Sequence, residues 1–146
     1  MNRKKFIKIC GLNCLGLTCG TLVLESCVGV KFIEGTLNNE FLEIPLSAFE
    51  MIENEEIRFR KYIIVQHNNL KYPICVYRNS STDYVALLMQ CTHQGTELQV
   101  FGERLQCPAH GSEFTKTGEV QNGPADNNLR TFPVEINGDI LKLNLS

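Results

Sequence analysis

Histidine is scarce in this sequence, and its scarcity limits the metal chemistry that the chain can support. Three histidines occur among 146 residues, and they are His67, His93 and His110. A mononuclear iron site of the oxygenase type needs two histidines and a carboxylate. If two of the three imidazoles belong to one metal centre, a second centre of that type cannot be built. The chain is therefore not expected to be a self-contained oxygenase.

A long helical period and a basic stripe are also missing. Short apolar and aromatic runs alternate with turn residues about every ten positions, which indicates an all-β domain. From Cys27 onward there are ten Lys and Arg against fifteen Asp and Glu, a net charge of −5. A chain with this acidic balance and no basic cluster is not expected to bind nucleic acid.

Two short clusters of one cysteine and one histidine are the strongest chemical signal in the sequence. Residues 91–93 read Cys-x-His and residues 107–110 read Cys-x-x-His. The stretch between them predicts a β-hairpin that turns at Phe101-Gly102 and brings the clusters face to face. Two thiolates and two imidazoles suit tetrahedral zinc, or a two-iron centre with the thiolates on one iron and the imidazoles on the other. Mixed pairs favour the two-iron centre, because zinc patterns usually keep cysteines and histidines in separate pairs.

Glycines stand close behind both histidines, at Gly95 and Gly111. Such positions allow tight turns whose backbone N–H groups approach an anionic centre. Residues 91–95 and 107–112 resemble the two cluster-binding boxes of Rieske proteins, and residues 122–125 resemble their proline loop. The resemblance extends over roughly the last two thirds of the chain, and a double box is a specific motif.

This resemblance implies one 2Fe-2S cluster per chain. The cofactor-binding residues would be Cys91, His93, Cys107, His110, Ser112 and Pro124. The two cysteines would bind one iron and the two histidines the other, exposed iron. The serine would donate a hydrogen bond to a bridging sulfide, and the proline would cover the cluster from one side. The implied fold is an antiparallel β-sandwich with a small cluster-binding subdomain at its tip.

Three positions depart from the Rieske subunits of respiratory cytochrome bc complexes. Thr96 and Ala109 stand where those subunits carry cysteines that form a disulfide between the boxes. Phe114 stands where they carry a tyrosine that donates a hydrogen bond to a cysteine sulfur. Such hydrogen bonds stabilise the reduced cluster, so the loss of one lowers the reduction potential. Within the range of about −150 to +300 mV for Rieske centres, we expect an intermediate value.

Residues 1–26 resemble an export signal. Four basic residues precede an apolar and small-residue stretch at 9–24, and they are Arg3, Lys4, Lys5 and Lys8. The basic start resembles a twin-arginine motif with lysine in the second basic position, and that pathway suits proteins that fold around a cofactor before export.

A lipid anchor is predicted at the end of this segment. Leu24-Glu25-Ser26-Cys27 resembles a lipobox, in which Cys27 would carry the lipid. The alternative is a retained N-terminal helix, but its weakly apolar span is shorter than the ~20 residues that a bilayer asks for. The sequence therefore predicts a protein anchored by lipid in the bacterial cell envelope and facing the periplasm, with a linker at 28–39 and a Rieske domain at 40–146.

The apolar pattern also predicts individual elements. Strands are expected at residues 40–46, 58–66, 72–77, 84–89, 131–136 and 139–145. Residues 50–56 are expected to form a loop or one helical turn, and Asn137-Gly138 to form a type I′ turn. His67 is interpreted as a surface turn residue. Cys75, within an apolar strand, is interpreted as a small buried hydrophobic residue.

The protein is predicted to carry one electron at a time and not to be an enzyme by itself, although it could be a subunit of an oxidoreductase complex. Its partner would be a cytochrome or an oxidoreductase of the envelope, and its acidic charge would suit a basic partner. Two alternatives stay open: a quinol-oxidising subunit of a cytochrome bc-type complex, and a zinc-bound module that has a binding role and no redox role.

Overall fold

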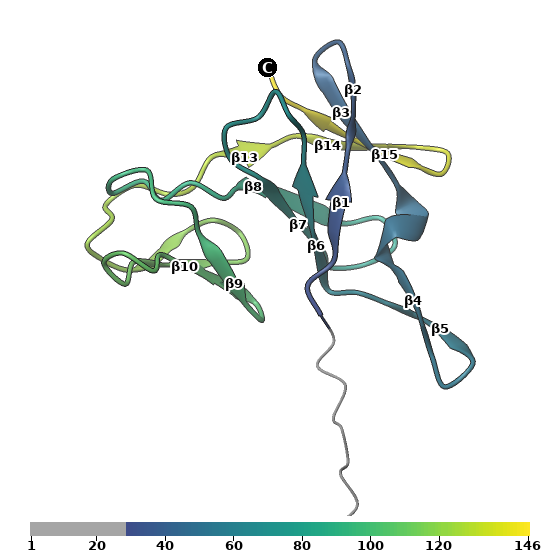
Figure 1. Ribbon diagram of the computed structural model, residues 1–146, viewed down its shortest axis with the longest axis horizontal. Coiled ribbons are helices and arrows are strands. Elements are labelled where there is room, and N and C mark those ends of the chain that lie inside the picture. The colour runs from purple at the N-terminus through teal and green to yellow at the C-terminus, as the bar shows by residue number, and fades with distance from the viewer. Residues whose placement is uncertain (1–28) are drawn as a thin grey trace, which may run out of the picture.

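The computed structural model describes residues 29–146 (Figure 1). The predicted export signal at 1–26 and the predicted lipidation site at Cys27 lie outside the described residues. In the described part, strands predominate and the one helical element is a short 3-10 helix, η1 (Leu46–Phe49). No helix in residues 29–146 is both long enough and apolar enough to cross a membrane. The prediction of an all-β domain is confirmed.

A five-stranded sheet forms the centre of the molecule. Its strands are, in order, β1 (Phe32–Glu34), β6 (Tyr62–Gln66), β7 (Ile74–Arg78), β8 (Tyr84–Leu88) and β13 (Thr131–Phe132). β1 pairs with β6 in parallel, and the other pairs are antiparallel. The predicted hairpin around the turn at 67–70 is the β6–β7 pair, so His67 lies in a turn as expected.

Two four-stranded sheets accompany the central sheet. One consists of β14 (Val134–Asn137), β15 (Ile140–Asn144), β3 (Phe41–Pro45) and β2 (Thr36–Asn38). The other consists of β12 (Val120–Asn122), β11 (Glu113–Thr115), β10 (Arg104–Gln106) and β9 (Gln99–Phe101). In Figure 1 the β9–β12 sheet and its loops lie at the left end, as the expected small subdomain.

The central strands bury both faces. Ile63 and Val65 belong to one hydrophobic cluster, together with Leu42 and Leu141 of the β14–β15–β3–β2 sheet. Ile64, between them in sequence, belongs to the other cluster, which includes Phe114 and Leu105 of the cluster-binding subdomain. Because side chains alternate along a strand, each face of the central sheet supports a different layer. This explains why the central strands read as continuous apolar runs.

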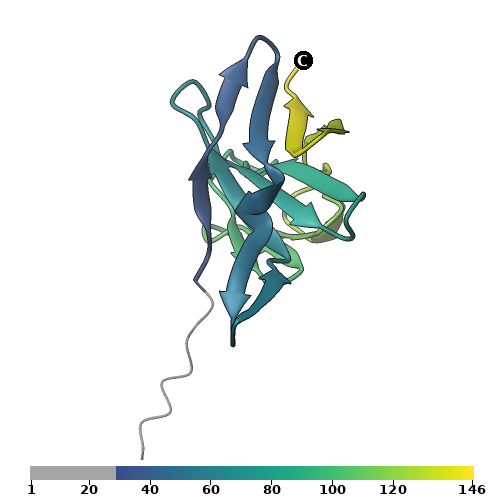
Figure 2. The ribbon, with the colours of Figure 1, turned by 90° about the vertical axis from the view of Figure 1, so that its right-hand side faces the viewer.

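A separate two-stranded hairpin projects from the body of the molecule (Figure 2). It consists of β4 (Glu50–Glu53) and β5 (Glu56–Phe59). The prediction of a loop or helical turn at 50–56 is wrong, because Asn54 and Glu55 adopt positive φ values of 53° and 65°, as a two-residue type I′ turn requires. Neither residue is a glycine, so the turn was not evident from the sequence.

Four further boundaries differ from expectation. The strand predicted at 58–66 is divided into the end of β5 and β6, which belong to different sheets. β1 and β2 lie within residues 28–39, where a linker was predicted, because their backbones pair with β6 and β3. The strand predicted at 131–136 is divided at Pro133 into β13 and β14, which belong to different sheets. The last hairpin turns at Gly138 and Asp139, with positive φ at Gly138, one residue beyond the predicted type I′ turn.

Candidate metal centre

The two ligand boxes lie at the ends of paired strands. The first box follows β8, and Gln90 forms an isolated bridge with Glu97 across it. The second box follows β10, which pairs with β9 through Val100 and Leu105. The hairpin predicted to turn at Phe101-Gly102 is thus present, and Gly102 has a φ of 63°. The subdomain sheet therefore carries both boxes to the same end of the molecule.

The two boxes share one backbone frame. In the first, Gly95 N–H donates to Cys91 C=O at 2.8 Å, and Cys91 N–H donates to Thr96 C=O at 2.8 Å. In the second, Gly111 N–H donates to Cys107 C=O at 3.0 Å, and Cys107 N–H donates to Ser112 C=O at 2.8 Å. Each loop is closed five residues after its cysteine.

The glycines are required by this frame. Gly95 has a φ of 74° and Gly111 a φ of 77°, in the left-handed region that other residues adopt at a cost. Each is the fourth residue after the cysteine of its box. The prediction of a tight glycine turn behind each histidine is confirmed.

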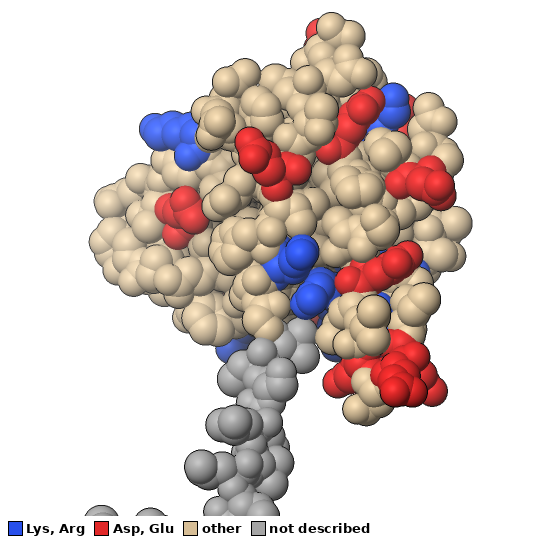
Figure 3. Space-filling view, turned by 45° about the vertical axis from the view of Figure 1, so that its right-hand side comes forward, with Lys and Arg blue, Asp and Glu red and all other residues tan. Residues whose placement is uncertain are grey.

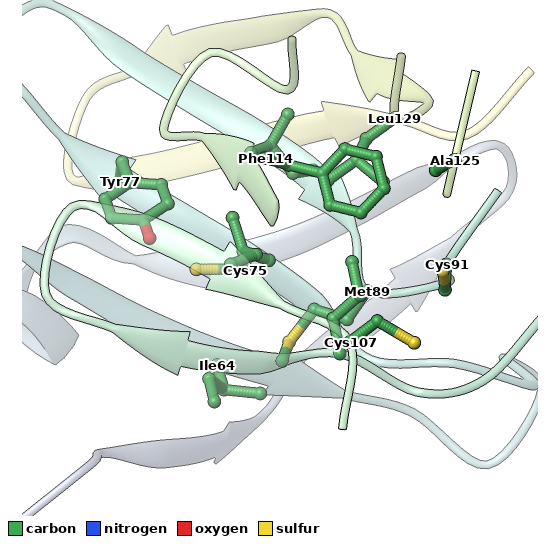
Figure 4. Packing of buried hydrophobic residues seen from close by; sticks show 12 residues of the cluster. Ile64, Cys75, Tyr77, Met89, Cys91, Cys107, Phe114, Ala125 and Leu129 are labelled. Carbon is green, nitrogen blue, oxygen red and sulfur yellow. The ribbon is translucent and has the colours of Figure 1, made fainter. Parts of the chain in front are cut away.

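Burial separates the thiols from the imidazoles. Cys91 is 1% exposed and Cys107 is 2% exposed, whereas His93 and His110 are exposed. The two imidazole rings face each other edge to face, with their centroids 5.0 Å apart. Figure 4 shows both cysteines at one end of a hydrophobic cluster that also contains Met89. The structure thus presents two inner sulfurs and two outer imidazoles.

The surroundings of Cys107 favour its thiolate form. Burial by itself raises the pKa of this thiol, but the backbone N–H groups of Ala109 and His110 act against it, as do the side chains of Cys91 and Thr96. Together they hold the pKa of Cys107 below its usual value. A thiolate is the form in which cysteine binds metals.

Ser112 connects the second box to the proline loop. Its side chain is fully buried, and its Oγ accepts a hydrogen bond from Ala125 N–H at 3.0 Å. This is the one hydrogen bond of the Ser112 side chain among residues 29–146, so its own proton is left to donate. The same loop is tied to the first box, because Thr92 Oγ1 donates to Asn127 C=O at 2.6 Å. Pro124, which is exposed, immediately precedes the first of these attachments.

The positions that depart from the cytochrome bc subunits have different surroundings. Phe114 is fully buried in the hydrophobic cluster with Ala125 and Leu129 (Figure 4). Ala109 is exposed and Thr96 half-buried, and neither has a thiol.

Cys75 is fully buried with a free thiol, as predicted, and burial raises its pKa well above the usual range.

Tyr72 supports the first box, and sequence reasoning did not find it. Its hydroxyl donates to Gly95 C=O at 2.6 Å, across 23 residues of sequence. Tyr72 follows the turn at 67–70, with Lys71 lying 5.3 Å from its ring centroid. Nothing in the local sequence distinguishes it from Tyr77, so only the spatial contact identifies its role.

We expect Tyr72→Phe to lower the free energy of unfolding by about 0.5–1.5 kcal/mol, the usual net value of one hydrogen bond. The first box would also lose an anchor, so iron should be released faster to a chelator. Chemical denaturation and a chelator time course measure these effects. Tyr84→Phe is the matched control, because its hydroxyl makes no hydrogen bond within residues 29–146 and iron release should stay as in the parent protein. Equal release rates for both variants would contradict a role of Tyr72 in holding the box.

Many solved structures resemble this chain, among them the following three. The cyanobacterial plasma membrane Rieske protein PetC3 from Synechocystis PCC 6803 is 29% identical, with 57% of this chain and 85% of that chain covered, at a TM-score of 0.49. A chain from the complex of reduced oxygenase and oxidized ferredoxin in carbazole 1,9a-dioxygenase is 21% identical, with 74% and 95% covered, at a TM-score of 0.54. Dicamba monooxygenase is 27% identical, with 59% of this chain but only 30% of that chain covered, at a TM-score of 0.42.

A comparison with protein families identifies the domain. No curated protein sequence matches the chain. Residues 48–133, more than half of the chain, match the family described as Rieske [2Fe-2S] domain. This range includes both boxes, the β9–β10 hairpin between them and the proline loop. The chain therefore belongs to the Rieske 2Fe-2S domain family and carries one 2Fe-2S cluster.

Proposed function

We propose that this protein is a one-electron carrier held at the bacterial cell envelope. Cys91 and Cys107 would hold the inner iron of the cluster, and His93 and His110 the outer one. The observation that carries this assignment is the separation of donors on two loops of one backbone frame, with both thiols buried and both imidazoles exposed. Inner thiolates and outer imidazoles are the arrangement that a Rieske centre needs.

The residues present fit the cluster chemically. Two thiols and two imidazoles are the donor set of a Rieske centre. Backbone N–H groups of Ala109 and His110 point toward the Cys107 sulfur, where negative charge would be greatest. The free proton of the buried Ser112 hydroxyl supplies one more donor. When bound, the cluster supplies reversible one-electron oxidation and reduction.

Side chains of the protein would exclude water from the cluster, donate hydrogen bonds to it and connect it to the surface. The hydrophobic cluster around Cys91 and Cys107 excludes water from the inner side of the site. Ser112 would donate a hydrogen bond to a sulfur of the cluster, and the proline loop that it anchors would cover one side. His93 and His110, at the surface, form the short route by which an electron enters and leaves.

The loops that carry the histidines have no charged residue, but Lys71 and Arg130 line a hollow together with His93. Residues 91–96, 107–112 and 122–125 contain no lysine, arginine, aspartate or glutamate. Pro108, Ala109 and Pro124 are exposed on these loops. A redox partner, a cytochrome or an oxidoreductase of the envelope, would therefore meet the histidines through close packing with these loops, beside Lys71 and Arg130. The acidic surface elsewhere would contribute little to this contact. Charge effects between exposed groups fade within about 10 Å at 0.1 M salt.

The envelope location rests on the sequence before residue 29. The export signal at 1–26 and the lipobox that ends at Cys27 would place the domain on the periplasmic side of a membrane, anchored by lipid. The domain at 40–146 would then project from the anchor through residues 28–39. The part of this stretch that the structure describes is paired with the domain's sheets, so the domain would lie close to the membrane surface.

Absorption and low-temperature EPR spectra of the purified protein, before and after reduction with dithionite, test the function. We expect a brown oxidised protein and, after reduction, a rhombic signal whose average g is lower than that of all-thiolate clusters, because imidazole nitrogen replaces two thiolates on one iron. A colourless protein that contains zinc would overturn the carrier. Co-purification with haem b would favour a subunit of a cytochrome bc-type complex.

A further inference from the structure

Five large apolar side chains are exposed at one end of the molecule. They are Val30, Phe32, Ile52, Ile57 and Phe59. Among the described residues, the other exposed large hydrophobic side chains are Phe101 and Ile136. The five come from the first described residues and from the β4–β5 hairpin, and both lie at the lower end of the molecule in Figures 1 and 2. Exposed apolar side chains gathered in this way mark an interaction surface.

The hairpin has one apolar face. Ile52 and Ile57 are cross-strand partners and are 82% and 66% exposed. Phe59 follows on the same face, since side chains two residues apart along a strand point the same way. The opposite face carries Arg58, which lies 3.3 Å from Glu53 and 4.0 Å from Glu56. The apolar face also carries Glu50, the cross-strand partner of Phe59, and the ion-paired face also carries Met51, the partner of Arg58. The hairpin therefore concentrates Ile52 and Ile57 on one face without excluding charge from it.

Positive charge borders the base of the hairpin. A groove of about 260 Å³ lies between the hairpin and the first described residues, with an apolar lining that includes Val30, Met51 and Phe59. Lys31, Arg60 and Lys61 also line it. The Nε of Arg60 is buried without a hydrogen-bond partner among the described residues, and its Nη1 donates to Gly29 C=O at 3.4 Å. Figure 3 shows basic side chains beside the point where the grey trace begins.

We propose that this end of the domain rests on a phospholipid bilayer, with Ile52 and Ile57 inserted among the lipids and the three cations at the phosphates. The inference rests on the proposed lipid anchor, because Cys27 precedes Gly29, at the groove, by two residues. A domain tethered so closely must present this end to the membrane. Apolar side chains with adjacent Lys and Arg are the combination that binds a bilayer interface.

The hairpin's carboxylates limit the depth of insertion. The polar side chains of Glu50, Glu55 and the two ion-paired glutamates stay at the level of the headgroups (Figure 3). Contact is thus shallow and suits zwitterionic phospholipid better than a strongly anionic surface.

This placement orients the redox site. The subdomain with β9 and β10 lies at the side of the molecule in Figure 1, whereas the hairpin and the start of the described chain lie at the bottom. With the hairpin on the bilayer, the subdomain that carries His93 and His110 lies at the side of the molecule. The partner reached most directly is then another membrane-bound protein, approached from the side.

The absence of tryptophan from the sequence permits a direct test. A single tryptophan is introduced as Ile57→Trp in the full lipidated chain, which is incorporated into phosphatidylcholine vesicles with brominated acyl chains. The matched control is Ile136→Trp on β14, an exposed isoleucine at 41% that lies away from the hairpin. We expect the tryptophan at position 57 to be quenched about twofold or more strongly than the one at position 136, with a blue-shifted emission.

The possible outcomes distinguish the contact between the hairpin and the bilayer from the lipid anchor on Cys27. If the chain floats with the vesicles and both tryptophans are quenched equally weakly, the hairpin contact is wrong and the anchor stands. If the emission at position 57 shifts with protein concentration and not with lipid, copies pair through the hairpin and the proposal is overturned. If the chain does not float at all, the anchor fails and the contact fails with it, although the spectra of the cluster would be unaffected.

Discussion

Cys107→Ser is expected to abolish cluster assembly. The Cys107 sulfur is buried, close to backbone N–H groups that stabilise a thiolate, and a serine hydroxyl at this position stays protonated and binds iron poorly. Loss of a group that only hydrogen-bonds to a metal ligand already lowers metal affinity about 10–100-fold. Loss of a ligand itself should therefore leave about a tenth of the iron or less. Iron and acid-labile sulfide per chain, with the visible absorption, measure this.

The control for this variant is Cys75→Ala. Cys75 is as deeply buried as the proposed ligands and belongs to the same hydrophobic cluster, but it lies within β7 and outside both boxes. Its removal leaves a small cavity and a modest loss of stability, while iron and sulfide should remain at the parent level. Full iron content in Cys107→Ser, or loss of iron in Cys75→Ala alone, would show that the ligand thiols are assigned wrongly.

Ser112→Ala is expected to lower the reduction potential while the cluster stays bound. A hydrogen bond to a charged group contributes about 1.5–3 kcal/mol. For a one-electron couple, a tenfold change in the equilibrium constant shifts the reduction potential by about 59 mV, so the potential should fall by roughly 65–130 mV. Redox titration followed by EPR measures it. The reciprocal variant Phe114→Tyr adds a hydroxyl where the cytochrome bc subunits carry one, and should raise the potential by a similar amount.

The same serine also contributes to stability. Ser112→Ala leaves the Ala125 N–H without its acceptor in a buried position, which should cost about 1–3 kcal/mol of unfolding free energy. Ser81→Ala, an exposed serine in the turn between β7 and β8, is the control and should change neither quantity. An unchanged potential in Ser112→Ala with a complete cluster would remove Ser112 from the hydrogen-bond donors of the site.

The ligand boxes could be predicted because their signals are local. Each box lies within six residues, and its glycine stands four residues after the cysteine, so the loop geometry depends on neighbours in sequence. The hairpin at Phe101-Gly102 was predictable for the same reason. The roles of the four ligands as a set remain a proposal, because the residues alone assign no iron to a given pair.

The contacts that hold the boxes in place could not be predicted. Tyr72 reaches Gly95 across 23 residues, Thr92 reaches Asn127 across 35, and Ser112 accepts from Ala125 across 13. The β4–β5 hairpin was missed for a different reason. Its apolar side chains alternate on a ribbon that packs against no sheet, and its turn uses Asn54 and Glu55 at positive φ without a glycine.

The sequence by itself determined the two glycine turns, the hairpin between the boxes and the all-β class, since turn chemistry and strand periodicity are properties of short segments. Only the tertiary structure decided which donors are buried and which are exposed. Burial depends on packing between segments far apart in the chain: β8 and β10 deliver the cysteines into a core shared with β7 and β11, while His93 and His110 extend past its edge. The same packing decided that the apolar hairpin lies beside the start of the described chain, which no local pattern could reveal.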